Sequence, residues 1–173
     1  GLGDVYKRQT LAGEAEFPIV AANVLYNGKT AFEDNVTFTA PDGTKIGVFG
    51  LDTPETATKA HPAKIQGVTF LAGDKMFDCA QDQVDALEAE GCEYIICLGH
   101  LGIDEESTGN RSIDLLEKVD GIDVFIDGHS HTVMENKQVY DAAGKAVTLT
   151  QTGSYFANVG EMTIAPDGTI SSR

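Results

Sequence analysis

A chain of 173 residues is long enough for one domain with a sizeable core, and 42% hydrophobic with 23% charged residues is an ordinary globular composition. Its 12 basic and 27 acidic residues give a formal net charge of −15, which disfavours binding of nucleic acid or anionic membranes by charge attraction. No apolar run approaches the roughly 20 residues that a membrane span needs, so we expect none. A small anionic substrate stays possible, because a bound metal ion inverts the local field.

Residues 1–9 have neither helical nor strand periodicity and lack the apolar segment of a signal peptide. We interpret them as a tail or a sequence scar, with a natural N-terminal arm as the alternative. The three cysteines, an odd number, indicate no disulfide framework. Cys97 lies in an apolar run and is expected to be a small buried side chain.

The first third of the chain is typical of β structure. An apolar run predicts a strand over residues 17–24, and a Pro-Asp-Gly-Thr turn joins two further strands, 36–39 and 45–51, into a hairpin. The second hairpin strand is apolar enough to be central in a sheet. Residues 52–66 have no period and are expected to form a loop, followed by a short strand at 68–71.

The middle of the chain alternates between helix and strand. A 3,4,3 spacing of apolar residues predicts a helix over residues 74–90, with Asp74 as its cap. A buried strand at 93–98, a second helix at 110–119 and a strand at 122–126 follow. This order indicates an α/β domain whose central strands are covered by other layers. The remaining segments, 137–140, 146–151 and 158–165, are expected to form antiparallel β structure.

Three of the four histidines follow two predicted buried strands. His100 follows the strand at 93–98, whereas His129 and His131 follow the strand at 122–126. A right-handed crossover through one helix makes these strands parallel neighbours, so all three imidazoles are expected to face one crevice at the carboxyl ends of the strands. His61 lies in the Thr- and Ala-containing loop and is expected at the surface.

Imidazole is the commonest side-chain ligand of Zn, Mn and similar ions, and a tight Gly-His-Ser-His turn can spread its two rings toward two metals about 3.5–4 Å apart. The alternative for a single histidine after a strand is a structural, hydrogen-bonded side chain. A His-x-His pair also occurs in amidohydrolases and metallo-β-lactamases, but the latter pattern needs an Asp-His where Thr132 and Val133 follow here.

The order of these motifs resembles a known family. Residues 17–170 resemble the 5′-nucleotidase / UDP-sugar hydrolase branch of the calcineurin-like metallophosphoesterases. The most specific pair is Leu-Gly-His-Leu-Gly followed by Gly-Ile-Asp and Gly-His-Ser-His at this spacing. The segments that carry the resemblance are residues 17–24, 46–56, 98–102, 121–132 and 151–155.

The resemblance implies a metallophosphoesterase-type layered β-sandwich flanked by helices, in which two divalent ions (Zn, Mn or similar) activate water for attack on a nucleotide or related phosphoester. His100 and His129 match ligands of one ion, and His131 matches a ligand of the other. It further implies that the parent protein is extracellular, periplasmic or associated with the cell wall.

Several family segments have no counterpart in this chain. The Asp-x-His, Gly-Asp and Gly-Asn-His-Glu segments are missing, and so is the family's second, nucleotide-binding domain. We therefore expect residues 10–173 to be the C-terminal half of a catalytic domain, with uncovered apolar faces and sheet edges. Such a fragment is expected to bind at most one ion weakly, to be inactive alone and to leave the catalytic residues unassigned. The alternatives are a metal-free α/β binding or interaction domain and another metallohydrolase, such as a deacetylase or amidohydrolase.

Overall fold

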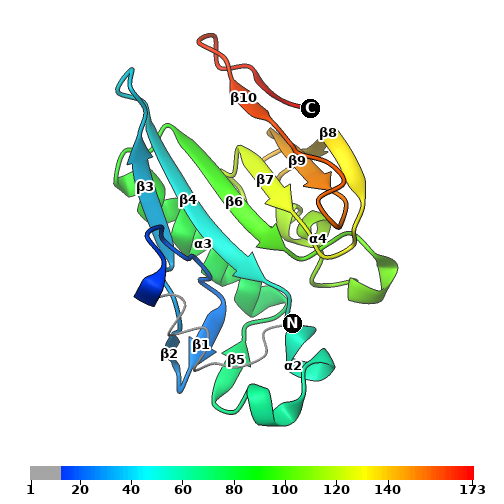
Figure 1. The fold of residues 1–173 in the computed structure, drawn as a ribbon. Coiled ribbons are helices and arrows are strands. Elements are labelled where there is room, and N and C mark those ends of the chain that lie inside the picture. The colour runs from blue at the N-terminus through cyan, green and yellow to red at the C-terminus, as the bar shows by residue number, and fades with distance from the viewer. Residues whose placement is uncertain (1–12) are drawn as a thin grey trace.

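A mixed six-stranded sheet forms the centre of the computed structural model, which describes residues 13–173 (Figure 1). Its strand order is β3-β4-β6-β7-β9-β8, in which β4, β6, β7 and β9 are parallel and the two edge strands are antiparallel to their neighbours. The α/β class is therefore confirmed. The strands are β3 (Asn35–Thr39), β4 (Lys45–Asp52), β6 (Tyr94–His100), β7 (Val124–Asp127), β8 (Val133–Tyr140) and β9 (Ala146–Thr152).

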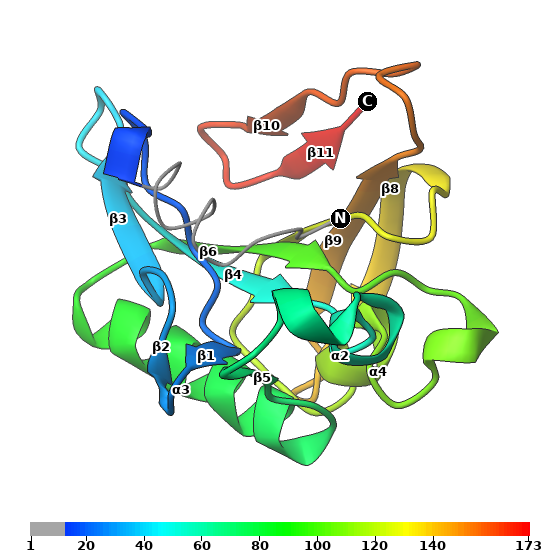
Figure 2. The same ribbon diagram turned by 60° about the horizontal axis from the view of Figure 1, so that its bottom comes forward.

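The helices α3 (Asp74–Ala89) and α4 (Ser112–Leu116) cover one face of this sheet (Figure 2). The amphipathic helix α3 buries one side against the sheet, where burial of apolar surface supplies most of its stability. The central core consists of side chains from these helices and from β4, β6, β7 and β9. Its largest fully buried members include Phe49, Phe125, Met76, Leu87, Leu101, Leu115, Leu116, Ile122 and Leu149.

Two details of the helices differ from the sequence predictions. Asp74 is the first helical residue rather than the cap, because Gly73 takes the N-cap position with a φ of 52°. The second helix is shorter than residues 110–119, since Arg111 and Glu117 are its two caps.

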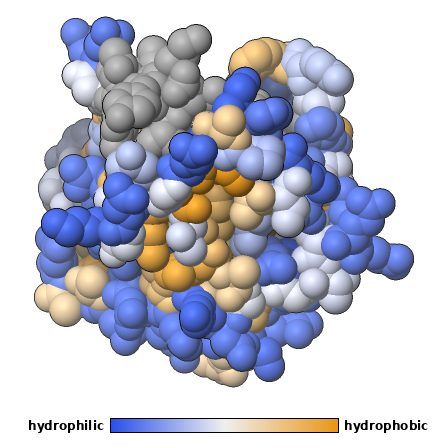
Figure 3. Space-filling view, turned by 90° about the horizontal axis from the view of Figure 1, so that it is seen from below, coloured by the Kyte–Doolittle hydropathy of each residue, from blue (hydrophilic) through white to orange (hydrophobic). Residues whose placement is uncertain are grey.

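Two smaller sheets flank the main one. The strands β1 (Val24–Tyr26), β2 (Lys29–Thr30) and β5 (Val68–Phe70) form one at the lower end of Figure 1, and β10 (Met162–Ile164) pairs with β11 (Ile170–Ser172) in the other. The β10–β11 hairpin lies on the face of the main sheet opposite the helices, next to β8 and β9 (Figure 2). Seen from below, the lower end shows apolar residues at its centre and hydrophilic residues around them (Figure 3).

Several sequence predictions for these flanking segments need correction. Within residues 17–24 only Val24 belongs to a strand, and Val20 makes an isolated bridge. This stretch packs across the end of β4 instead, where the buried Asn23 side chain binds the backbone of Asp52 in both directions. Residues 52–66 form a loop with two short helices, α2 (Thr56–Lys59) and η1 (Pro62–Lys64).

The C-terminal segments also differ from the sequence predictions. The segments after residue 132 are not antiparallel throughout, because β9 pairs with β7 in parallel. The predicted strand at 158–165 is shortened to β10. Residues 1–9, which the sequence analysis interprets as a tail or a sequence scar, lie outside the described residues. Within residues 13–173, no helix is both long and apolar enough to cross a membrane.

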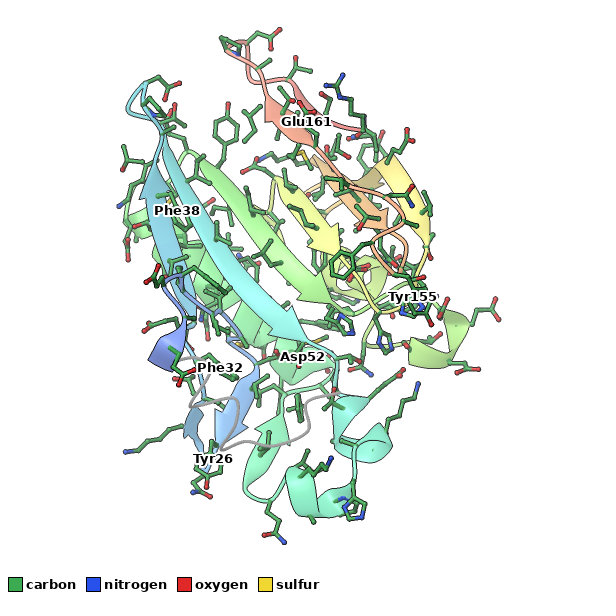
Figure 4. The ribbon with its side chains drawn as sticks, in the orientation of Figure 1. Tyr26, Phe32, Phe38, Asp52, Tyr155 and Glu161 are labelled. Carbon is green, nitrogen blue, oxygen red and sulfur yellow. The ribbon has the colours of Figure 1, made fainter. Side chains whose placement is uncertain are left out.

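The two faces of β6 have different surroundings. Cys97 is fully buried beneath α3, as predicted, and Leu98 points to the opposite face because successive strand residues alternate. Leu98 stays 42% exposed although β6 is a central strand, and Phe38 on β3 is also exposed (Figure 4). This face of the sheet therefore carries apolar side chains in contact with solvent.

Gly50 makes room for the N-terminal segment that crosses β4. A Cβ at this position would lie 2.1 Å from the carbonyl oxygen of Val20. We predict that Gly50→Ala lowers the free energy of unfolding by about 1–3 kcal/mol, because backbone has to shift to relieve the overlap. Urea denaturation measures the change. Gly13→Ala, where a Cβ meets nothing within 4 Å, is the matched control, and equal stability of the two variants would contradict the packing.

The start of α4 depends on one carboxylate. Asp114 accepts hydrogen bonds from the Arg111 guanidinium at 2.9 and 2.7 Å and from the backbone N–H groups of Gly109 and Arg111. The Arg111 side chain is the main cause that holds the pKa of Asp114 below its usual value, although partial burial opposes it. Folding therefore favours the ionised form of Asp114.

This lowered pKa predicts a pH-dependent stability. Because the folded pKa of Asp114 lies below the unfolded one, its contribution is complete above the unfolded pKa near 4 and is lost as the pH falls through the folded pKa. We expect Asp114→Asn to cost about 1–3 kcal/mol at pH 7 and progressively less toward pH 2, as measured by urea denaturation at each pH. The exposed Asp78→Asn is the control. A cost for Asp114→Asn that does not change with pH would refute this assignment.

Candidate metal site

The parallel strands β4, β6 and β7 end at one edge of the sheet, where Asp52, His100 and Asp127 are their last residues. Asp52 is the register partner of His100, and β7 runs directly beside β6. The rings of His100 and His129 lie edge to face, with 5.1 Å between their centroids and a 67° angle between their planes. The structure thus brings these two predicted side chains together.

Asp127 joins the two loops that carry these histidines. Its buried Oδ1 accepts hydrogen bonds from the backbone N–H groups of Leu101 at 3.0 Å, Gly102 at 3.1 Å and Gly128 at 2.8 Å. The first two donors follow His100, and the third precedes His129. One carboxylate oxygen therefore fixes the spacing of both turns. From the sequence, Asp127 was only an acidic residue at the end of an apolar strand. That pattern does not predict that its carboxylate joins two loops.

His100 packs on one side and is exposed on the other. A Cβ added to Gly128 would lie 3.1 Å from His100 Nδ1, so the ring packs closely beside this glycine. Desolvation is the main cause that lowers the pKa of His100, and the neighbouring His129 acts in the same direction, whereas Asp52 opposes both. The neutral imidazole that this favours is the form that binds metal.

Glu55, which the sequence analysis did not single out, contacts His129. Its Oε2 lies 3.1 Å from Nε2 of His129, while Oε1 accepts a short hydrogen bond from the Ser107 hydroxyl. Lys59 Nζ lies 2.5 Å from Oε2. These partners, Lys59 first and Ser107 second, lower the pKa of Glu55 to about 2 against a smaller opposing effect of burial.

The Gly-His-Ser-His turn has a strained backbone. His129 and His131 take φ values of 76° and 54°, in a region that non-glycine residues seldom occupy. The buried Gln151 holds the turn, since its Oε1 accepts from the Ser130 hydroxyl at 3.0 Å and from the Thr132 N–H at 2.8 Å.

His131 makes its ring contact with Tyr155 rather than with the pair formed by His100 and His129. It is exposed, and its ring neighbour is Tyr155 at 6.4 Å between centroids. Figure 4 shows Tyr155 beyond the end of β9 and Asp52 at the end of β4, at the same edge of the sheet. His61 is exposed, as predicted, and its Nδ1 accepts from the Ala63 N–H in a local turn.

The donor set at this edge fits part of a metal shell. Two imidazoles with touching rings can supply two of the four to six donors that Zn or Mn binds. Among residues 13–173, no group of three or more His, Cys, Asp or Glu side chains is placed to hold an ion. Metal ligation by His100, His129 and His131 therefore stays a prediction.

Comparisons with known proteins relate the chain to nucleotide phosphoesterases. The trifunctional nucleotide phosphoesterase protein YfkN of Bacillus subtilis is 34% identical over 172 residues, covering 88% of this chain and 11% of that protein. The NAD 5′-nucleotidase of Haemophilus influenzae is 33% identical over 132 residues, covering 72% of this chain and 19% of that protein. No family model matches the chain.

Solved structures share the fold. A 5′-nucleotidase precursor from Thermus thermophilus matches with a TM-score of 0.74 at 26% identity, covering 95% of this chain and 34% of that one. The calcineurin-like phosphoesterase YfkN from Bacillus subtilis matches with a TM-score of 0.68 at 25% identity, covering 92% and 55%. The chain thus spans between about a tenth and about half of the length of these relatives.

The role of Asp127 predicts a large loss of stability on its removal. Asp127→Ala leaves three backbone N–H groups without their acceptor, and we expect the free energy of unfolding to fall by about 2–4 kcal/mol in urea. Asp167→Ala is the control, because Asp167 accepts from the single N–H of Thr169 on an exposed turn. We expect that control to cost at most about 1 kcal/mol. Equal losses in the two variants would show that Asp127 does not join the loops as described.

Proposed function

Because this chain matches 5′-nucleotidases in sequence and in fold over most of its own length, we propose that it forms part of the catalytic domain of a metal-dependent nucleotide phosphoesterase. Its relatives are phosphoesterases, so the chain belongs to a hydrolase family. The observation that carries the proposal is the contact between the rings of His100 and His129 at the carboxyl ends of adjacent parallel strands.

In the complete parent domain the histidines would divide between two divalent ions, Zn, Mn or similar, whereas this chain alone would hold at most one ion weakly. His100 and His129 together would hold one ion, and His131 on the exposed side of the turn would contribute to the other. Bound at such a site, two divalent ions polarise a phosphate ester and lower the pKa of water. The chain's own part is to present imidazoles in a fixed arrangement, which Asp127 provides by joining the loops after β6 and β7.

The proposed substrate is a nucleotide or a related small phosphoester rather than nucleic acid. With a net charge of −15, the protein repels extended phosphate backbones, and local attraction of one phosphate would depend on the ions. We propose that residues 10–173 are an incomplete catalytic domain with little or no turnover by themselves, because the family's further ligand segments have no counterpart here. We also place the full-length parent outside the cytoplasm, by resemblance to the family.

A metal-free binding or interaction domain is the second candidate. The observation that favours it is that residues 13–173 bring no third His, Cys, Asp or Glu ligand to the pair of rings. In that case His100 and His129 would serve as structural side chains at the edge of the sheet. Metal titration separates the two candidates.

We expect Mn²⁺ or Zn²⁺ to raise the midpoint of thermal unfolding of the wild-type chain. An ion present at 100 times its Kd stabilises by about 2.7 kcal/mol, which corresponds to a shift of roughly 5–10 °C for a domain of this size. The His100→Ala/His129→Ala double variant should lose the shift, and the exposed His61→Ala control should keep it. An unchanged unfolding midpoint in the wild type would support the metal-free candidate. An equal rise of the midpoint in the double variant would show that the ion binds elsewhere in the chain.

A further inference from the structure

The Glu55 carboxylate holds one nitrogen of His129. The distance from Glu55 Oε2 to His129 Nε2 is 3.1 Å, and both side chains are mostly buried. A carboxylate that is ionised at neutral pH can only accept a hydrogen bond, so Nε2 must carry the proton. A neutral imidazole with its proton on Nε2 has its free lone pair on Nδ1.

Three loops at the same edge of the sheet meet at this carboxylate. Glu55 follows β4, Ser107 lies in η2 (Glu105–Ser107) after β6, and His129 follows β7. Ser107 is 4% exposed and donates to the oxygen that His129 does not use. Lys59, one turn along α2, completes the set of partners. Glu55 is thus anchored independently of the ring that it orients.

His100 presents the complementary nitrogen. A Cβ at Gly128 would lie 3.1 Å from its Nδ1, so Nδ1 is the ring nitrogen on the side of that glycine. Nε2 of His100 and Nδ1 of His129 are thus the ring nitrogens that these two contacts do not involve. This assignment does not follow from the Gly-His-Ser-His motif, because a histidine in a sequence has two equivalent candidate donors.

We propose that Glu55 is a positioning residue that accepts the Nε2 proton of His129, fixes the orientation of its ring and makes Nδ1 the nitrogen that binds metal. This inference rests on the proposed metal-dependent function. Carboxylate partners of this kind orient ligating histidines in metal proteins, and their loss reduces metal affinity about 10–100-fold.

Long-range ¹H–¹⁵N correlation spectra of the histidine rings in the metal-free full chain test the inference. We expect His129 to be the Nε2–H tautomer in the wild type and a mixture of tautomers in Glu55→Ala. Zn²⁺ affinity, measured by competition with a chromogenic chelator, should fall about 10–100-fold in that variant. Glu55→Gln replaces the carboxylate by an amide that can accept from or donate to Nε2, so we expect a mixture of tautomers and an intermediate affinity.

Two controls separate positioning from general damage to the fold. The exposed Lys64→Ala removes a nearby lysine that is not among these contacts of Glu55, so the His129 tautomer should persist and Zn²⁺ affinity should stay within about threefold. His61, whose Nδ1 accepts from Ala63 N–H, is an internal reference that should read as Nε2–H in every variant. If Glu55→Ala unfolds, the wild-type spectrum and the Zn²⁺ affinity of Glu55→Gln carry the test. A wild-type His129 with its proton on Nδ1, or an unchanged affinity in Glu55→Gln, contradicts the assignment.

The results distinguish this inference from the proposed function. An unchanged tautomer and unchanged Zn²⁺ affinity in Glu55→Ala would overturn the role of Glu55 while leaving the metal site in place. A wild-type chain that binds no Zn²⁺ would overturn the proposed function and, with it, the role of Nδ1 as a ligand. The tautomer spectra would then still decide whether Glu55 fixes the ring.

Discussion

The geometry at the carboxyl edge of the sheet depends on the hydrogen bonds that one buried oxygen accepts. Asp127 Oδ1 binds the N–H groups that follow His100 and the N–H that precedes His129, so two loops 25 or more residues apart in sequence share one acceptor. Loops seldom hold side chains firmly, because their backbone lacks the partners of a helix or strand. Here the carboxylate supplies those partners, and the two imidazoles keep their contact.

A second carboxylate adds orientation to this spacing. Glu55 contacts His129 from the loop after β4, and Ser107 ties the same carboxylate to the segment after β6. Asp127 thus sets where the rings lie, whereas Glu55 sets which nitrogen of His129 is protonated. Both are acidic residues in a strongly acidic chain. Each accepts hydrogen bonds from backbone or side-chain groups, and these bonds offset the cost of burying a carboxylate. This explains how two carboxylates can be packed beside a site proposed for an anionic substrate.

The sequence predicted the parts of the fold that depend on local pattern. Apolar runs located β4, β6 and β7, and the 3,4,3 spacing located α3, because burial of one face determines both. It failed for most of residues 17–24, because this run packs across β4 through the buried Asn23 and only Val24 enters a strand. The positions of His100 and His129 after two neighbouring strands also predicted the contact between their rings. Glu55 and its partner are 74 positions apart, and no periodicity reveals a contact of that kind.

The central claim is that His100 and His129 form one half of a metal shell whose spacing Asp127 maintains. A crystal of the chain soaked in Zn²⁺ and measured at the zinc absorption edge tests it most directly. We predict an anomalous peak about 2.0–2.1 Å from a ring nitrogen of both histidines, with the hydrogen bonds of Asp127 intact. A peak located elsewhere, or no peak beside rings that have moved apart, would contradict the account.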